Sequence, residues 1–484
     1  MTLIEELQGL LGLNAVLCDG SEIAGFVEDW RGRYRGLAAC VVLPSNTDQV
    51  SAVVCACVRA GVPVLPQGGN TSLCGGAVPE SAGPPPVIVN LSRMRCVRSL
   101  DAANNSIEVE AGCVLATVQQ AAAAAGRLYA VSLGAEGSCQ IGGNIATNAG
   151  GTGVLRYGNT RDNILGLEVV LPDGTVWDGL SRLRKNNTGL DLKHLFIGSE
   201  GTLGIVTAAT LKLHPLPTAY AVSWMAVSSP TAALEMLGLF QSACGAQLSA
   251  YEMIDSGQLR IVLEYVPGRR APLPPTHKWH VLVELSDTRN EDALIEVMHQ
   301  VLEEGSELGL VDEAVVATTG AQRAAMWEVR HSVSEGNKKA GVGLTTDSAV
   351  PVSVVPEFIE RATAAVHEIV PGLPIIVVGH LGDGNVHFIP FFSFPQWEAL
   401  PDREAVGQRI KHAVNEVGHA LGGTFSAEHG IGQTLTAEMA IFKSPVELGL
   451  MRSIKQLLDP ANLFNPGRLL PPSIPVPSTT QEPS

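Results

Sequence analysis

Glycine is concentrated in two loops of this chain, and this concentration limits how the chain can fold. The first loop, residues 67–76 (QGGNTSLCGG), follows the apolar segment VPVLP, and in the second, residues 134–153, seven of twenty residues are glycine. Packing alone rarely needs such density, because glycine loses much conformational freedom on folding. Loops of this kind can turn successive backbone N–H groups toward an anion, so they predict a site for the pyrophosphate of a dinucleotide. Two long surface loops are the alternative.

The common nucleotide motifs do not account for these loops. Neither reads GxGxxG at the opening of a helix, and neither carries the Gly-Lys-Ser/Thr of a P-loop. A Rossmann NAD site and a P-loop are therefore not supported.

Size and charge narrow the function classes. A chain of 484 residues exceeds what one core usually organises, so we expect two or three domains. The net charge of −16 repels phosphate, which argues against nucleic acid and anionic membrane as partners, and a carboxylate substrate would need a local positive site. Glu5 and Glu6 stand where a signal peptide carries Lys or Arg, and nine cysteines show no CxxC spacing. We expect a cytoplasmic protein with reduced thiols.

The apolar pattern predicts two domains of different construction. Residues 39–66 read strand, helix, strand, and ILGLEVVLPDGTVW reads as a hairpin that turns at Asp173–Gly174. The Pro-rich LHPLPTAY suggests a boundary near residue 216, beyond which helices alternate with strands as in an antiparallel sheet covered by helices. We expect an α+β fold with domains at 1–216 and 217–430, a C-terminal segment at 431–470 that returns to the first domain, and a disordered tail at 471–484.

Two histidine-containing segments could carry chemistry. In VVGHLGDGNVHFIP, a two-residue turn at Asp383–Gly384 would pair His380 with His387 on one face of a hairpin, where one metal could contact both rings. FSAEHGIG adds Glu428 and His429, which completes the ligand types of a two-His, one-carboxylate site. Hydrogen-bonded packing of the histidines and an exposed edge for FSAEHGIG are the alternatives. Neighbouring residues on a strand face opposite sides, so Glu428 and His429 need a turn to act together.

Four ordered motifs resemble the FAD-binding domain of the vanillyl-alcohol oxidase superfamily: LPQGGNTSLCGG, IGGNIATNAGG, YGNTRDNILGLEVVLPDGTV and HLFIGSEGTLGIVT. The resemblance extends over residues 35–470 and is specific to the D-2-hydroxy-acid dehydrogenase branch, with its glycolate oxidase FAD-linked subunits, D-lactate dehydrogenases and D-2-hydroxyglutarate dehydrogenase. It implies a two-subdomain FAD-binding domain and an α/β cap domain with an antiparallel sheet. Asn70 stands where some relatives attach the flavin to a His, so FAD is expected to be non-covalent.

The same resemblance implies site residues. The cofactor contacts would be Gly68, Gly69, Asn70, Thr71, Gly142, Gly143, Asn148, Gly151, Glu200, Gly201 and Ile205. A divalent ion, usually zinc, would be held by His380, His387 and Glu428, with His429 as the base that takes the hydroxyl proton. The substrate carboxylate would be held by Arg330 of the Trp-x-x-Arg motif, with Ser334 and Asn385 as polar contacts. Without the resemblance, an Arg on a helix is more often a solvated surface charge.

Two departures from the family pattern bear on the substrate. Thr345 stands where dicarboxylate-using relatives have Lys, and Leu435 replaces the Lys of HGIGxxK. Each departure removes a cation that could hold a distal carboxylate of the substrate. We therefore expect oxidation of a lactate-like or glycolate-like monocarboxylate to the 2-oxo acid by hydride transfer to flavin.

Other readings stay open from the sequence. They are a D-2-hydroxyglutarate dehydrogenase, a FAD-binding subunit of a multi-subunit glycolate oxidase, a flavin-binding subunit without catalysis of its own, and a metal-dependent hydrolase in which the glycine loops are structural. The electron acceptor would be a quinone, an electron-transfer protein or O2, and a homodimer is one expectation for the assembly.

Overall fold

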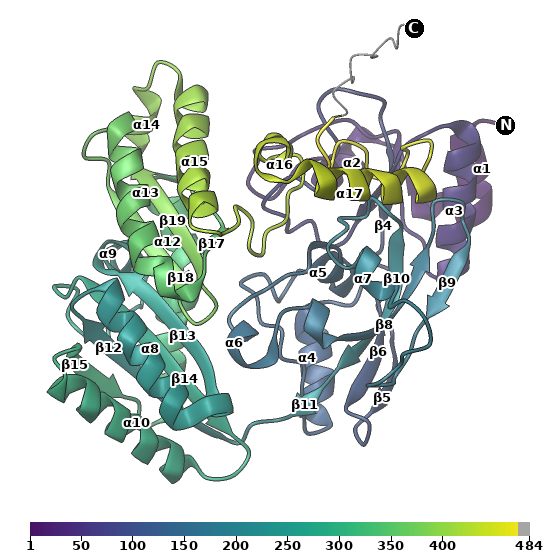
Figure 1. Ribbon diagram of the computed structural model, residues 1–484. Helices are drawn as coiled ribbons and strands as arrows, with labels where there is room; N and C mark the ends of the chain where they lie inside the picture. Colours follow the sequence, from purple (N-terminus) through teal and green to yellow (C-terminus); the bar gives the residue numbers. More distant parts are fainter. Residues whose placement is uncertain (473–484) are drawn as a thin grey trace, which may run out of the picture.

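The computed structural model describes residues 1–472, which form two regions of different construction (Figure 1). The predicted tail at 471–484 lies outside the described residues except for its first two positions. One cluster of buried side chains runs from Leu7 to Leu213 and includes Phe464, and another runs from Ala219 to Val414. Apart from Phe464, the first cluster ends before residue 216 and the second begins after it. The Pro-rich segment predicts a boundary at this position.

The first domain begins with a small mixed sheet in the order β1-β2-β4-β3, in which β2, β4 and β3 run parallel. Helix α3 connects β2 to β3, starts at an Asn46 cap and ends at Gly61, whose φ of 64° few other residues adopt readily. The elements here are α1 (Leu3–Leu11), β1 (Val16–Leu17), α2 (Gly20–Val27), β2 (Cys40–Val42), α3 (Thr47–Ala60), β3 (Val64–Gln67) and β4 (Val87–Asn90).

The rest of the first domain is an antiparallel sheet in the order β5-β6-β10-β8-β9. The predicted hairpin is confirmed, because β8 and β9 pair around Gly174, where φ is 85°. The elements are β5 (Val97–Asp101), β6 (Ser106–Glu110), α4 (Leu115–Ala124), β7 (Arg127–Leu128), α5 (Ile141–Thr147), α6 (Val154–Tyr157), β8 (Ile164–Val170), β9 (Val176–Gly179), α7 (Lys193–Phe196), β10 (Ile205–Lys212) and β11 (His214–Pro215).

The second domain is built on one large antiparallel sheet in the order β15-β12-β14-β13-β18-β19-β16, with β17 also paired to β19. Its strands are β12 (Ala219–Val227), β13 (Leu248–Asp255), β14 (Trp279–Asp287), β15 (Val311–Val316), β16 (Val342–Gly343), β17 (Ser348–Ala349), β18 (Ile375–His380) and β19 (Asn385–Phe392). Its helices are α8 (Pro230–Cys244), α9 (Ser256–Tyr265), α10 (Glu291–Glu307), α11 (Gly320–His331), α12 (Val333–Ala340), α13 (Val355–Ile369), α14 (Phe394–Glu398) and α15 (Arg403–Ala420).

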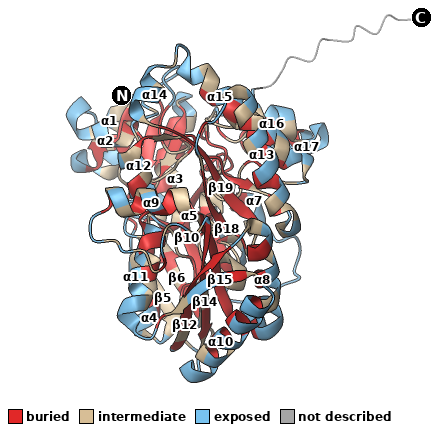
Figure 2. Cartoon of the chain, turned by 90° about the vertical axis from the view of Figure 1, so that its left-hand side faces the viewer, coloured by how far each residue is buried: buried red, intermediate tan, exposed pale blue. Residues whose placement is uncertain are grey.

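Helices cover both faces of this sheet. Along β12, Ala221 and Met225 join the core shared with α8, α10, α13 and α15, while Val222 and Trp224 join the core shared with α9 and α11. The strands therefore lie buried in the middle and the exposed helix faces lie outside (Figure 2). The predicted α+β class and the antiparallel sheet of the second domain are confirmed.

The C-terminal segment lies along the first domain (Figure 1). It carries α16 (Thr436–Phe442) and α17 (Pro445–Leu458), and residues 463–465 bond to Val64 on the free edge of β3. Phe464 is fully buried in the first core. Within residues 1–472, no helix combines the length and the apolar character that a membrane crossing requires.

Candidate active site

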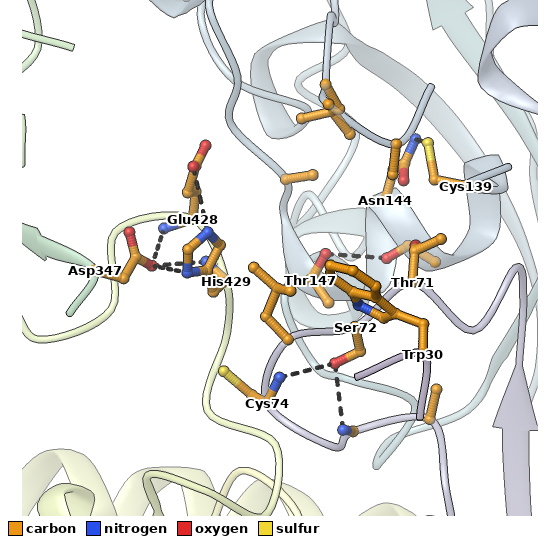
Figure 3. A pocket seen from close by; sticks show the side chains of 18 of the residues that line it. Trp30, Thr71, Ser72, Cys74, Cys139, Asn144, Thr147, Asp347, Glu428 and His429 are labelled. Carbon is orange, nitrogen blue, oxygen red and sulfur yellow. Dashed lines mark hydrogen bonds and ion pairs between the residues drawn. The ribbon is translucent and has the colours of Figure 1, made fainter. Parts of the chain in front are cut away.

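One cavity of about 1080 Å³ joins the two glycine loops to the sheet of the second domain. Its wall includes Gly68 and Gly143 from the loops, His387 from β19, and Glu428 and His429 from the segment before α16. Figure 3 shows Glu428 and His429 across the cavity from Thr71 and Thr147. The motifs that the sequence singles out separately therefore meet in one place.

The glycines of the two loops serve two different purposes. A Cβ at Gly69 would lie 2.1 Å from the carbonyl oxygen of Ser138, and one at Gly151 would lie 2.0 Å from that of Ser132, so these glycines allow backbones to pack together. A Cβ at Gly143 would meet nothing within 4 Å, and this residue lines the cavity. Its backbone is therefore open to a ligand.

The predicted cofactor contacts line this cavity with one exception. Asn148 is absent from the wall; its Oδ1 accepts the N–H of Arg161 at 2.9 Å and its left-handed backbone, with φ of 51°, ends α5. Gln140, which the sequence analysis missed, lines the cavity with its buried Oε1 unpaired within the described chain. A bare backbone and a free acceptor fit a polar cofactor such as FAD. The residues on the wall are Gly68, Gly69, Asn70, Thr71, Gly142, Gly143, Gly151, Glu200, Gly201 and Ile205.

The register predicted for the histidine hairpin is wrong. His380 pairs with Asn385 and Val378 pairs with His387, so the loop holds four residues, 381–384, instead of two. The ladder stops early because Asp383 donates its N–H to the His380 carbonyl and accepts the N–H of Asn385 through Oδ1, which forms a side-chain-stabilised turn. His380 and His387 are diagonal neighbours on one face, with ring centroids 5.5 Å apart. The same-face expectation is confirmed.

Four side chains near the hairpin bring their ligand atoms within 4.8 Å of one another: Asp347, His387, Glu428 and His429, here called the Asp347 quartet. Glu428 Oε1 lies 3.4 Å from His387 Nε2 and 3.5 Å from His429 Nε2. Asp347 Oδ2 lies 3.5 Å from His429 Nδ1, and the buried Nδ1 of His387 has no hydrogen-bond partner in the described structure. Two carboxylates and two imidazoles at these separations fit a divalent cation.

Asp347 also creates the turn that Glu428 and His429 need. Its Oδ2 accepts the backbone N–H groups of Ala427, Glu428 and His429 at 3.0, 2.9 and 2.8 Å. The predicted turn is confirmed, and both side chains reach the cavity from adjacent positions. The first domain also holds this segment, because Gly151 donates its N–H to Glu428 Oε2 at 2.9 Å.

His380 belongs to a different network, the Glu252 triad of Glu252, Arg330 and His380. Glu252 lies opposite His380 on the neighbouring strand and accepts from His380 Nδ1 at 2.8 Å and from Arg330 Nε at 2.8 Å. Arg330 Nη2 lies 3.3 Å from His380 Nε2, and because a guanidinium only donates, Nε2 accepts and the ring proton sits on Nδ1. The triad is almost completely buried.

Known proteins resemble this chain over nearly its whole length. Residues 216–469 match the C-terminal domain of FAD linked oxidases, and residues 38–179 match an FAD binding domain. The chain is 36% identical over 475 residues to a probable mitochondrial D-2-hydroxyglutarate dehydrogenase of Oryza sativa subsp. indica. The alignment covers 97% of this chain and 82% of that protein. It is 32% identical over 479 residues to a putative mitochondrial D-lactate dehydrogenase of Schizosaccharomyces pombe. That alignment covers 96% of this chain and 89% of the relative.

The chain belongs to the family of FAD-linked D-2-hydroxy-acid dehydrogenases. The resemblance predicted from the four motifs is thereby confirmed. Among solved structures, p-cresol methylhydroxylase with substrate bound has a TM-score of 0.74 at 16% identity and covers 96% of each chain. An alkyldihydroxyacetonephosphate synthase has a TM-score of 0.75 at 17% identity, with 96% of this chain and 84% of that one covered. These likenesses show the fold alone.

The structure of this FAD-linked dehydrogenase changes the roles of two predicted residues. Asn385 is absent from the cavity wall and is buried; its amide donates to Asp347 Oδ1 at 3.2 Å and to the Ser348 carbonyl at 3.0 Å. It holds Asp347 in place and is not a substrate contact here. Glu200 lines the cavity, but its carboxylate accepts the backbone N–H groups of Ile431 and Gly432, both at 2.7 Å. Ser334 is exposed on α12 and faces the cavity as predicted.

Burial and neighbouring charges shift the pKa values of the quartet of this dehydrogenase in opposite directions. Burial opposes charge on His429, but Asp347 and Glu428 outweigh burial and raise the pKa of His429 to about 9. Burial also raises the pKa of Glu428, yet its contacts with His387 and His429 leave that pKa well below its usual value. In the triad, His380 and Arg330 likewise overcome burial and lower the pKa of Glu252. The carboxylates of Glu428 and Glu252 are therefore ionised at neutral pH.

Proposed function

We propose that this protein oxidises a D-2-hydroxy acid to the 2-oxo acid, with non-covalently bound FAD as the hydride acceptor and a divalent cation, zinc by preference, at the active site. The observation that carries this proposal is the single cavity that joins the glycine loops, the Asp347 quartet and Arg330. Relatives with 32–36% identity named for D-2-hydroxyglutarate or D-lactate add support.

FAD, when bound, supplies the acceptor for the hydrogen that leaves the substrate carbon. The residues that would hold it are the backbone groups of the two glycine loops, with the open backbone at Gly143 and the free Oε1 of Gln140. Asn70 cannot form the covalent link that some relatives make through a histidine. Its amide instead donates to the carbonyls of Gly25 and Glu28 at 3.2 and 2.8 Å, which fixes the loop.

A divalent cation, when bound, supplies Lewis-acid polarisation of the substrate hydroxyl. His387 and Glu428 would hold it together with Asp347 or His380, because His387 Nε2 and Glu428 Oε1 face each other at 3.4 Å, longer than a normal hydrogen bond. His429 is the proposed base. A base must be neutral to accept a proton, and Asp347 and Glu428 keep His429 protonated near neutral pH unless another positive charge balances them.

Arg330 is the proposed partner of the substrate carboxylate. Arg330 lines the cavity. Its Nε contacts Glu252 and its Nη2 contacts His380, and these two contacts hold the guanidinium in one orientation. A guanidinium held in this way is oriented before the substrate arrives, which reduces the entropy lost on binding.

The electron acceptor and the location complete the proposal. The electron acceptor after FAD is a quinone, an electron-transfer protein or O2, and the location is cytoplasmic. Whether the substrate is a monocarboxylate or a dicarboxylate depends on the charged side chains that line the cavity.

An anaerobic panel of D- and L-2-hydroxy acids tests the proposed function. We expect the purified yellow protein to lose its flavin absorbance with at least one D-acid and to retain it with the L-enantiomer, and chelation should abolish the bleaching without releasing FAD. A colourless protein that takes up no added flavin would favour the hydrolase alternative. A yellow protein that no 2-hydroxy acid bleaches would favour a subunit without its own catalysis.

A further inference from the structure

Four cationic side chains line the cavity and have no carboxylate partner in the part of the chain that the structure describes. Arg31 and Arg33 come from the loop between α2 and β2, Lys338 comes from α12, and Lys411 comes from α15. Arg31 and Lys338 contact the ring of Trp30, 4.8 and 5.6 Å from its centroid. In a chain with a net charge of −16, cations gathered from both domains without counter-charge point to an anionic ligand.

Two cations next to these residues in the sequence are paired with carboxylates. Arg35 lies 3.7 Å from Glu28, and Lys339 lies 2.6 Å from Glu335. Arg35, Glu28 and Lys339 do not line the cavity, whereas Glu335 does. Arg31, Arg33, Lys338 and Lys411 differ from these two neighbours, because they face the cavity without a carboxylate partner among the described residues.

Lys411 supplies a cation beside the position where the family pattern has Lys and this chain has Thr345. A Cβ at Gly407 would lie 3.7 Å from the Leu344 side chain, so this face of α15 packs against the segment that contains Thr345. Lys411 is one turn further on the same face. Burial and the charge of Arg33 lower the pKa of Lys411, and an anion between them would relieve both penalties.

Arg31 and Arg33 supply cations beside the other departure, Leu435. The Tyr34 hydroxyl lies 2.6 Å from the Thr434 hydroxyl, which fastens the loop to the residue before Leu435. Asp29 shapes this loop by accepting the N–H groups of Arg33 and Tyr34 at 2.7 and 2.6 Å. Each lysine position that the chain has lost is thus flanked by a cation from another element.

We propose that Lys411, Arg31 and Arg33 form an anion subsite that binds a second anionic group of the substrate, a distal carboxylate in the simplest case. This inference rests on the proposed function and specifies its substrate class. It replaces the expectation of a monocarboxylate, because the charge missing at positions 345 and 435 is supplied from α15 and from the loop at 29–34. Recognition of the FAD pyrophosphate by the same cations is the competing outcome.

Kinetics with two matched acids test the subsite in the holoenzyme. D-2-hydroxyglutarate carries a distal carboxylate, and D-2-hydroxypentanoate has the same carbon chain without it. We expect a higher kcat/KM for the dicarboxylate in the wild type. Lys411→Met should raise KM for the dicarboxylate about 10- to 100-fold, the usual effect of losing a charged hydrogen bond, and leave the monocarboxylate nearly unchanged. Lys411→Arg should restore most of the loss.

Further variants separate the outcomes. Arg33→Met, at an exposed position, gives a second test if Lys411→Met fails to fold, and Lys185→Met, at an exposed position, controls for a change in net charge outside the cavity. A wild type that prefers the monocarboxylate, or equal losses on both acids, would refute the subsite but not the oxidation of hydroxy acids. Loss of FAD from the Lys411 and Arg33 variants would assign the cations to the cofactor and also refute it. Failure of every D-2-hydroxy acid to reduce the flavin would refute the proposed function itself.

Discussion

The Glu252 triad and the Asp347 quartet meet the same hairpin, through His380 and His387 respectively, but they differ in charge balance. In the triad, one carboxylate faces one guanidinium and one imidazole, and the facing atoms lie 2.7 to 3.3 Å apart. In the quartet, two carboxylates and two imidazoles lie 3.4 to 3.9 Å apart, and one imidazole nitrogen has no partner. Hydrogen bonds are normally shorter than these separations. The triad is a closed network that orients its members, whereas the quartet has room for a cation.

The largest effect should follow from removing the proposed base of the quartet. We expect His429→Ala to lower kcat about 10²- to 10⁴-fold, the usual contribution of a general base, with FAD content unchanged. Stopped-flow flavin reduction measures this step directly. His299→Ala, at an exposed position on α10, is the matched control and should match the wild type. Equal rates in the His429 variant and the wild type would remove His429 from the chemistry.

Cation binding should separate the quartet from the triad. We expect Asp347→Asn to weaken zinc binding about 10- to 100-fold, because Asp347 both faces the site and holds the backbone of Glu428 and His429. Metal content after dialysis and restoration of flavin reduction by added Zn²⁺ are the measurements. Full activity after complete chelation would show that the quartet works without a cation.

Breaking the triad should act first on stability. Glu252→Gln leaves the buried Arg330 without its carboxylate, and removing one partner of a buried ion pair costs about 3–5 kcal/mol in the free energy of unfolding. Urea unfolding measures the change, with the exposed Glu303→Gln as control. An unchanged midpoint would mean that Arg330 finds another partner or is hydrated.

The smallest expected effect is a change in pH dependence at Asp255, which shares β13 with Glu252 but faces no cation at ion-pair distance in the described structure. Burial raises the pKa of Asp255 to about 7. The folded protein then binds this proton more tightly than the unfolded chain, so the free energy of unfolding should fall as pH rises from about 4 to about 7.

Asp255→Asn keeps the cap of α9 and should flatten that slope. Urea midpoints at several pH values on both sides of this range provide the measurement. A slope identical to that of the wild type would show that Asp255 titrates normally in the folded protein.

The sequence predicts the parts of this site that depend on local pattern. Glycine density locates both loops of the cavity, and the Asp173–Gly174 pair locates a hairpin. The same turn rule fails at Asp383–Gly384, because the Asp383 side chain takes the Asn385 N–H and lengthens the loop. A dipeptide therefore predicts a turn more reliably than it predicts the register of the strands that follow.

The residues that sequence reasoning missed are single charges brought in by tertiary structure. Glu252 meets His380 across two strands separated by more than a hundred residues, and Asp347 meets His429 through a loop. No spacing in the sequence marks either carboxylate. Lys411 was missed for a related reason, since the family pattern directs attention to positions 345 and 435 and the compensating charge lies on a helix elsewhere.

The pairing of residues 463–465 with the edge of β3 has a consequence for how the protein is made. The first sheet is translated before the second domain, but the segment that covers its edge and contributes Phe464 to its core is translated after that domain. Domains tend to fold as they emerge. We therefore expect the first domain to complete its core, and to bind the coenzyme, only after the second domain has been translated.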